Sequence, residues 1–212
     1  KAIVKNGGDT WFFLTSDYAF GHALERDTMA VVKANGGKVL GAVRHPINTS
    51  DFSSFLLQAQ ASKAKIIGLA NAGGDTINAI KQGAEFGIVA GGQKFAGLLI
   101  FAPDVAALGL KTAQGLQFTE TFYWDLNDGT RAWTKRWDKE RNAAGKLPSM
   151  NMAGVYAGTL HYLKAVAAIK SAADGKAVVA EMKKLPTDDA LFGKGSVRVD
   201  GRVLHPAYLF EV

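Results

Sequence analysis

Two turns of this chain carry groups that suit the binding of a small molecule better than the packing of a core. The first, residues 16–21, presents Tyr18 and Phe20 shortly after the apolar run 11–14. A tyrosine in a turn offers a flat apolar face and a hydroxyl, which together hold a ring or an aliphatic group and its polar end. Tyr18 is therefore the first candidate contact residue. The alternative is that it only packs on the surface.

The second turn, residues 71–75, follows the apolar run 65–70 and contains Gly73 and Gly74. Two absent side chains would let amide N–H groups at a helix start approach an anion, which contributes about 0.3 to 1 kcal/mol, or up to about 2 kcal/mol when partly buried. This favours a carboxylate over an amide or a sugar. The alternative is a tight connection without a binding role. The spacing is no dinucleotide fingerprint, and no phosphate-loop lysine follows it.

A third turn contains Pro103 and Asp104, directly after the apolar run 95–101. Asp104 is a candidate ligand contact, and its position after a proline also fits the cap of a short helix. In open α/β sheets, ligands bind at the turns that follow the carboxyl ends of strands. We therefore expect the turns around Tyr18, Asn71 and Pro103 to share one edge of a sheet, and this edge is the predicted binding surface.

The sequence between these turns predicts strands that alternate with helices. Short apolar runs typical of strands lie at 10–14, 39–43, 65–70, 95–101 and 116–121, and helical spacing of apolar residues lies between them. The helices have recognisable punctuation, such as the stop at residues 35–37 and the N-cap side chains Thr49, Ser50 and Asp51. Short connections of this kind predict an α/β fold with a mainly parallel sheet.

The second half of the chain changes character. A long amphipathic helix carries Trp133 and Trp137, whose spacing of four predicts core side chains on one face, and a second helix extends from about residue 152 to 169. A third covers 178–185 and ends at Pro186. No strand is predicted among these three helices. Their apolar faces must therefore pack against another part of the protein. The tail, 193–212, returns to strands, with a hairpin signal at Asp200 and Gly201.

The first residues predict the last turn of a helix with a glycine stop at residues 7 and 8. We therefore expect the natural protein to continue upstream of Lys1, and this upstream part is the expected cover for the helices of the second half. A fragment without it would expose apolar faces and could associate with another copy.

Composition narrows the class of protein. The chain has 212 residues, 48% hydrophobic content, a net charge of +6 and no cysteine. No apolar run approaches the roughly 20 residues of a membrane span. The basic residues are scattered, which predicts a solvated surface and no nucleic-acid partner. Absent cysteines exclude disulfides and thiolate chemistry and leave the compartment open.

Catalytic and metal-binding patterns are not found in the sequence. There is no G-x-S-x-G elbow, no H-E-x-x-H motif and no sensibly spaced pair of carboxylates. The four histidines, His22, His45, His161 and His205, are widely spaced and show no metal-ligand pattern, and His161 is expected to be packed or solvated. We expect no enzyme, no metal and no cofactor.

The order of the segments resembles the type I periplasmic solute-binding proteins of ABC importers, in the branched-chain amino-acid-binding group. The segments that carry the resemblance are FFLTSDYAFG at 12–21, DFSSFLLQAQASKAKIIGLANAGGD at 51–75, FYWDLN at 122–127 and GRVLHPAYLFEV at 201–212. The resemblance covers essentially the whole chain. It implies two Rossmann-like lobes with a ligand cleft, the first lobe being incomplete here. Residues 1–9 would end lobe 1, 10–122 would form the core of lobe 2, 123–186 would return to lobe 1, and 187–212 to lobe 2.

The resemblance also implies site residues. Tyr18 matches the aromatic residue that such proteins lay over the ligand, and the turn facing the cleft matches Asn71, Ala72, Gly73 and Gly74. Later contact segments match residues 101–104 and 120–123, which adds Phe101, Asp104, Glu120 and Phe122. An amino-acid ligand would need an acidic residue facing its ammonium group, and only Glu120 or Asp104 fits. The aromatic residues fit an aromatic carboxylate at least as well.

These expectations favour a periplasmic receptor that closes two lobes around a small carboxylate, either an amino acid or an aromatic acid, and presents it to the membrane permease of an ABC importer. The alternative is the effector-binding domain of a transcription regulator, which shares this fold and would carry DNA-binding helices upstream. A nucleotide-dependent α/β enzyme ranks third, because the phosphate-binding loop is missing.

Overall fold

The computed structural model describes residues 1–142 and 146–212. The chain divides into two compact units, the first formed by 1–119 with 209–212 and the second by 120–208. In this division residues 1–9 belong to the first unit and residues 187–208 to the second. The assignment of segments to lobes that the resemblance implies stays a prediction.

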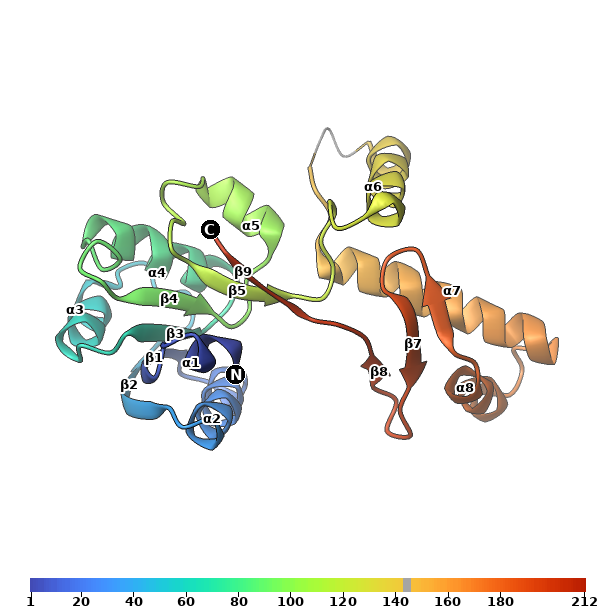
Figure 1. Ribbon diagram of the computed structural model, residues 1–212, viewed down its shortest axis with the longest axis horizontal. Coiled ribbons are helices and arrows are strands. Elements are labelled where there is room, and N and C mark those ends of the chain that lie inside the picture. Colours follow the sequence, from blue (N-terminus) through green and yellow to red (C-terminus); the bar gives the residue numbers. More distant parts are fainter. Residues whose placement is uncertain (143–145) are drawn as a thin grey trace. The chain divides into compact units, whose positions relative to one another are not determined.

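The first unit is built on a six-stranded sheet with the order β2-β1-β3-β4-β5-β9 (Figure 1). Its strands are β1 (Thr10–Ser16), β2 (Lys38–His45), β3 (Ile66–Ala70), β4 (Lys94–Gly97), β5 (Gln117–Glu120) and β9 (Tyr208–Glu211). The pairings β1–β2, β1–β3, β3–β4 and β4–β5 are parallel. The predicted α/β fold with a mainly parallel sheet is therefore confirmed.

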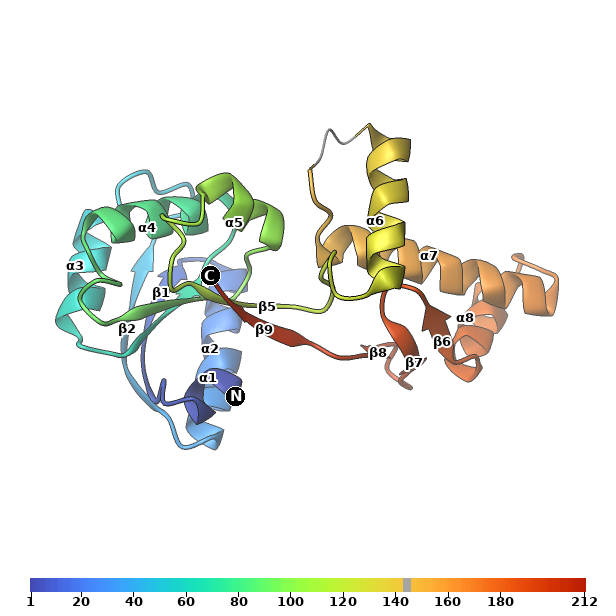
Figure 2. The same cartoon turned by 45° about the horizontal axis from the view of Figure 1, so that its top comes forward.

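Helices connect these strands (Figure 2). The connecting helices are α2 (Ala19–Ala34), α3 (Ser53–Ala61), α4 (Gly73–Glu85) and α5 (Ala102–Leu108), and the short helix α1 (Ala2–Lys5) precedes β1. The predicted glycine stops are confirmed at Gly7 and Gly36, both of which have positive φ. The predicted cap of α3 differs in detail. Phe52 occupies the N-cap position, and Asp51 accepts a hydrogen bond from the N–H of Ser53 instead (2.8 Å).

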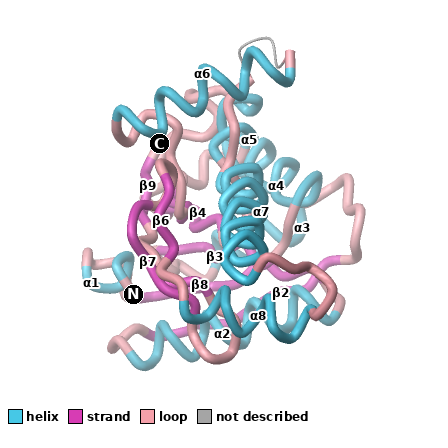
Figure 3. Tube along the Cα trace, turned by 90° about the vertical axis from the view of Figure 1, so that its right-hand side faces the viewer, coloured by secondary structure: helices cyan, strands magenta, loops and turns pink. Residues whose placement is uncertain are grey.

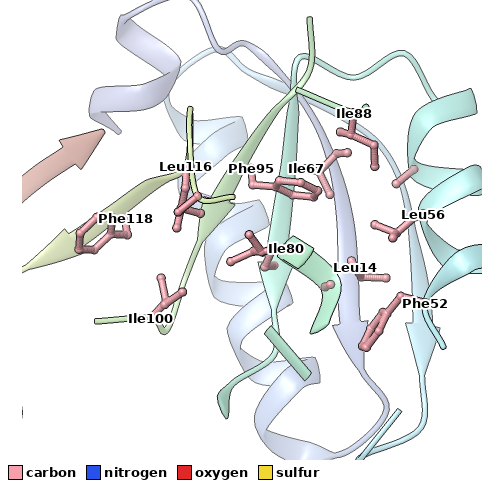
Figure 4. Packing of buried hydrophobic residues seen from close by; sticks show 14 of the residues in the cluster. Leu14, Phe52, Leu56, Ile67, Ile80, Ile88, Phe95, Ile100, Leu116 and Phe118 are labelled. Atoms are coloured by element: carbon pink, nitrogen blue, oxygen red, sulfur yellow. The ribbon is translucent and has the colours of Figure 1, made fainter. Parts of the chain in front are cut away.

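The central strands are buried on both faces. On one face of the sheet Leu14 and Ile67 pack with Leu56, Ile80 and Phe95 (Figure 4). On the other face Trp11, Phe13 and Ile66 pack with Val4 and Val32. Alternate side chains of one strand point to opposite faces, so a continuous apolar run is what a strand covered on both sides needs. The prediction from residues 11–14 is confirmed.

The fourth strand is shorter than the apolar run 95–101 predicted. It ends at Gly97, because the chain bends there and Ile100 folds back over the glycine. A Cβ at Gly97 would lie only 2.4 Å from Cγ2 of Ile100. Beyond the strand, the N–H of Leu98 reaches the carbonyl oxygen of Leu69 at 3.4 Å. Residues 98–101 then lead to α5.

The second unit contains the helices α6 (Asp128–Arg141), α7 (Met150–Ile169) and α8 (Gly175–Lys184), and a three-stranded sheet of β6 (Thr187–Asp189), β7 (Gly193–Val197) and β8 (Val203–Leu204) (Figure 3). The three predicted helices are confirmed. The predicted hairpin is also confirmed, because β7 and β8 pair antiparallel across the turn that contains Gly201.

An aromatic cluster forms the core of this unit. Phe122 and Trp133 meet edge to face with ring centroids 5.6 Å apart, and Trp133 contacts Tyr156 in the same way at 5.5 Å. Trp133 is buried as predicted, whereas Trp137 is half-buried at the rim of the cluster. Val155 and Leu163 of α7 remain exposed. The self-association expected from such faces stays a prediction.

Among the described residues, no helix combines the length and the apolar character that crossing a membrane requires.

A close approach of α2 to the sheet generates a test of this packing. A Cβ at Gly21 would lie 2.1 Å from the carbonyl oxygen of Ser16 and 3.1 Å from that of Ala70. We expect Gly21→Ala to lower the free energy of unfolding by about 1–3 kcal/mol, because backbone must move to relieve the overlap. Urea denaturation measures this change. In the matched control Gly74→Ala, the new methyl group meets no atom within 4 Å, and the unfolding free energy should stay level or rise slightly. An equal loss in both variants would contradict the packing described.

The last strand generates a pH prediction. Glu211 of β9 pairs with Lys94 of β4 and accepts a hydrogen bond from Nε2 of Gln117 in β5 (2.7 Å). Mainly the Lys94 hydrogen bond, and then that of Gln117, lower the pKa of the Glu211 carboxyl. A lowered folded-state pKa adds stability above the unfolded-state pKa and loses it as the pH falls through the folded-state value.

We therefore expect Glu211→Gln to lose stability at neutral pH and to lose less than the wild type on acidification below about pH 4.5. The effect should be at most about 1 kcal/mol, since the pair is half exposed and screened by solvent. Melting temperatures from pH 7 to pH 3 measure it. Parallel pH profiles for the two proteins would contradict the docking of β9 through this carboxylate.

Candidate ligand-binding site

The carboxyl ends of β1, β2, β3 and β4 lie at one edge of the sheet, because these strands are parallel. Ser16 ends β1, His45 ends β2 and Ala70 ends β3. The turns that contain Tyr18, Asn71 and Pro103 follow the ends of β1, β3 and β4. The predicted gathering of these three turns at one edge is confirmed, and this edge is the candidate site.

Tyr18 lies at the start of α2, in the N-cap position. Its N–H donates to the carbonyl oxygen of Ser16 (2.9 Å), so the turn is tight. The side chain is 43% exposed and contacts Phe20, with ring centroids 5.6 Å apart. An exposed aromatic pair of this kind can hold a flat or apolar group from solution. The contact of Tyr18 with a ligand stays a prediction.

Asn71 has a different environment from the one its place in a turn suggested. The residue is fully buried, and its carboxamide links two other buried side chains. Thr76 donates its hydroxyl proton to Oδ1 of Asn71 (2.7 Å), and Nδ2 of Asn71 bonds to Nε2 of His45 (3.1 Å). Both ends of the carboxamide are therefore engaged inside the protein.

Ala72, Gly73 and Gly74 form the exposed part of the same turn. Gly73 has φ +57°, a conformation that other residues adopt only with strain, and a Cβ at Gly73 or Gly74 would meet no atom within 4 Å. The N-cap residue Ala72 provides no side-chain hydrogen bond to α4. Asp75, in the first turn, accepts from the N–H of Asn48 instead (3.2 Å). The first turn of α4 therefore has no capping side chain from Ala72, and the binding of an anion there stays a prediction.

Phe101 and Asp104 begin α5. Oδ2 of Asp104 accepts a hydrogen bond from the N–H of Phe101 (3.0 Å), and Phe101 occupies the N-cap position. The capping interpretation of Asp104 is therefore confirmed. Both side chains are half-buried, and their contact with a ligand stays a prediction.

Glu120 and Phe122 belong to the second unit. Glu120 is buried, and its Oε2 accepts a hydrogen bond from the N–H of Met150 at the start of α7 (3.1 Å). Phe122 is 1% exposed and packs in the aromatic core of that unit. Within the second unit, Glu120 thus forms a hydrogen bond to the backbone and Phe122 packs in the core. Whether they also contact a ligand stays a prediction.

Sequence reasoning did not single out His45 as part of this edge. It is fully buried at the end of β2, beside the end of β1, and it forms hydrogen bonds to the Tyr18 turn and to the Asn71 turn. The signal that could have found it is a histidine at the inward position where a strand ends, directly before a proline. Within the described residues, no three His, Cys, Asp or Glu side chains are grouped so as to hold a metal ion. His161 is packed, and its Nε2 bonds to the carbonyl oxygen of Met182 (2.7 Å).

Comparisons with known proteins match this chain over its whole length. A sequence profile described as "Periplasmic binding protein" matches residues 1–212. A crystal structure of a periplasmic binding protein from Burkholderia mallei is 55% identical, with a TM-score of 0.90, over 100% of this chain and 55% of that chain. The chain therefore spans about half the length of this relative. No match is found among curated proteins.

Two further structures extend the comparison. A branched-chain amino-acid ABC transporter periplasmic ligand-binding protein from Burkholderia xenovorans is 40% identical, with a TM-score of 0.88, over 99% of this chain and 55% of that chain. An ABC transporter solute-binding protein from Rhodopseudomonas palustris, in complex with p-hydroxybenzoic acid, is 25% identical, with a TM-score of 0.85, over 100% of this chain and 58% of that chain.

The division between buried and exposed groups at the edge generates a prediction. We expect Asn71→Ala to lower the free energy of unfolding by about 1–3 kcal/mol, because His45 and Thr76 would each keep a buried polar group without its partner. The control Tyr18→Ala removes an exposed ring and should change stability by less than about 0.5 kcal/mol. Thermal and urea denaturation measure both. A larger loss in Tyr18→Ala than in Asn71→Ala would reverse the roles assigned to the two side chains.

Proposed function

The chain belongs to the periplasmic binding protein family, and on that premise we propose that it forms a large part of the ligand-binding receptor of an ABC importer for a small carboxylate. It has the type I periplasmic-binding-protein fold, in which its structural neighbours match it over its whole length. The family consists of solute-binding proteins and not of enzymes. A periplasmic location and a membrane permease as partner are parts of the proposal.

The observation that carries this proposal is the exposed edge that holds Tyr18 beside the open first turn of α4. An aromatic face and helix-end N–H groups complement the two halves of a small organic acid, which are an apolar body and a carboxylate. Closure of two lobes around the ligand would also require contacts from the other lobe, and these would come from residues outside this edge.

Within the carboxylates, the hydrogen bonds favour an aromatic acid over an amino acid. The two acidic residues that fit the ammonium group of an amino acid both serve the backbone: Asp104 accepts from the N–H of Phe101 and Glu120 from that of Met150. The ring pair Tyr18 and Phe20 supplies aromatic surface that a benzoate would match. An aromatic acid needs no counter-charge for an ammonium group.

Both transporter neighbours described above support an importer over the effector domain of a transcription regulator. One is named for branched-chain amino acids, and the other holds p-hydroxybenzoic acid. These ligand classes define the panel for the test.

The test is a thermal-shift screen of the protein with whatever sequence precedes Lys1 in its gene. The panel contains leucine, valine, benzoate, 4-hydroxybenzoate, benzamide and glucose. We expect a rise in melting temperature with the benzoates, because a ligand bound only by the folded state stabilises it by mass action. Benzamide, which keeps the ring and lacks the carboxylate, should give a much smaller shift.

Tyr18→Ala should lose most of the shift while its unliganded melting temperature stays close to that of the wild type. Leu110→Ala is the control, since Leu110 is an exposed apolar residue outside the three turns. A shift with leucine alone would overturn the aromatic-acid assignment and keep the receptor. No shift with any carboxylate would overturn the receptor itself.

A further inference from the structure

His45 is a fully buried residue at the end of β2 that forms hydrogen bonds to two of the three turns of the candidate site, those of Tyr18 and Asn71. The strand order β2-β1-β3 places Ser16 between His45 and the residue that follows β3. Ser16 and His45 are direct partners in the register of β1 with β2, and Thr15 and Ala70 are partners in that of β1 with β3. The ends of three adjacent strands therefore converge on the imidazole.

The side chain of His45 orients the second turn. Its Nδ1 donates to the carbonyl oxygen of Pro46 (2.8 Å), which can only accept. Its Nε2 then accepts from Nδ2 of Asn71 (3.1 Å), and Oδ1 of Asn71 accepts from the hydroxyl of Thr76 in α4 (2.7 Å). The donors and acceptors along this chain are mutually consistent, so the rotation of the Asn71 carboxamide is determined by the histidine ring.

The backbone of His45 orients the first turn. Its carbonyl oxygen accepts a hydrogen bond from the N–H of Asp17 (2.8 Å), the residue before Tyr18. The hydroxyl of Ser16 approaches Nε2 of the same histidine at 3.4 Å. A change in the position of His45 would therefore shift the Tyr18 turn as well as the Asn71 turn.

The ring itself has little freedom to move. Phe52 meets it edge to face with centroids 4.8 Å apart, and Phe55 does so at 5.9 Å. Asp75 in the first turn of α4 accepts a hydrogen bond from the N–H of Asn48 in the loop that follows β2. The loop after β2 is thus attached to the first turn of α4 at a second point. Packing and hydrogen bonds together define one orientation of the imidazole.

We propose that His45 is the positioning residue of this site. It sets the separation between the exposed ring of Tyr18 and the open turn Ala72, Gly73 and Gly74, and in this way it sets the affinity for the ligand without touching it. The effect on ligand affinity rests on the proposed function, whereas the positioning of the two turns does not.

Two substitutions separate positioning from packing. His45→Asn keeps a donor near the position of Nδ1 and provides no acceptor at the position of Nε2. His45→Gln reaches further and restores an acceptor near Nε2. Ile67→Val serves as the control, because it removes one buried methyl group from β3 in the same core and no hydrogen bond. It should lower the global stability of the protein only modestly.

The first measurement is amide hydrogen exchange of the ligand-free protein, with whatever sequence precedes Lys1 in its gene, at a temperature where every variant is folded. We expect His45→Asn to speed exchange at residues 17–18 and at residues 77–78, whose amides donate to the first turn of α4, by about tenfold or more relative to the wild type, because local opening becomes easier. In His45→Gln the increase should be smaller at residues 77–78. In Ile67→Val both turns should exchange as in the wild type. Unchanged exchange in His45→Asn, or an equal increase in Ile67→Val, would overturn the proposal.

The second measurement is calorimetric titration with 4-hydroxybenzoate. We expect His45→Asn to weaken binding by about tenfold, which corresponds to about 1.4 kcal/mol. His45→Gln should recover part of this loss. Ile67→Val should bind as tightly as the wild type. If the wild type binds and His45→Asn binds equally tightly, the link from positioning to affinity is wrong. If the wild type does not bind 4-hydroxybenzoate, the aromatic-acid part of the proposed function fails, and the exchange data alone decide the role of His45.

Discussion

The pairing of β1 on both of its edges is the constraint on which the first unit depends. This strand lies between β2 and β3, parallel to both, and its side chains are buried on both faces of the sheet. A strand with no free edge and no wet face has a single register, since a slip by one residue would exchange its two faces. Because that register is set, the carboxyl ends of the three strands come together at one place.

At this place the protein separates buried polar groups from exposed ones. His45, Asn71 and Thr76 satisfy one another inside the sheet edge, as buried polar groups must. Tyr18 and Gly73 lie just outside them and face solvent. In the candidate site this hydrogen-bonded polar layer would limit the reorganisation that a ligand has to induce.

The second unit follows a different principle. Its helices surround an aromatic core in which Phe122 and Trp133 meet edge to face, and its buried acid Glu120 binds the N–H of Met150 at the start of α7. A carboxylate near a helix start is a stabilising arrangement in itself. Glu120 and Asp104 therefore show how an acidic residue that suits an ammonium ligand can serve the backbone of its own unit.

The sequence by itself determined the order and type of the elements, because these depend on local periodicity and on local stops and caps. The apolar run 11–14, the glycine at position 36 and the hairpin at Gly201 are each interpretable within a few residues. The sequence also indicated the protein family, because several distinctive segments occur in the order typical of that family. The gathering of the Tyr18, Asn71 and Pro103 turns followed from parallel strands alone.

Only the tertiary structure decided which residues at that edge are free. His45 and Asn71 are 26 residues apart in sequence and meet because β1 lies between β2 and β3. No local pattern states the order of strands in a sheet, so none could show that the Asn71 carboxamide is engaged or that Gly97 lets Ile100 fold back. A side chain is available to a ligand only when it is not already hydrogen-bonded or packed against another part of the fold. Such partners are brought together by long-range packing.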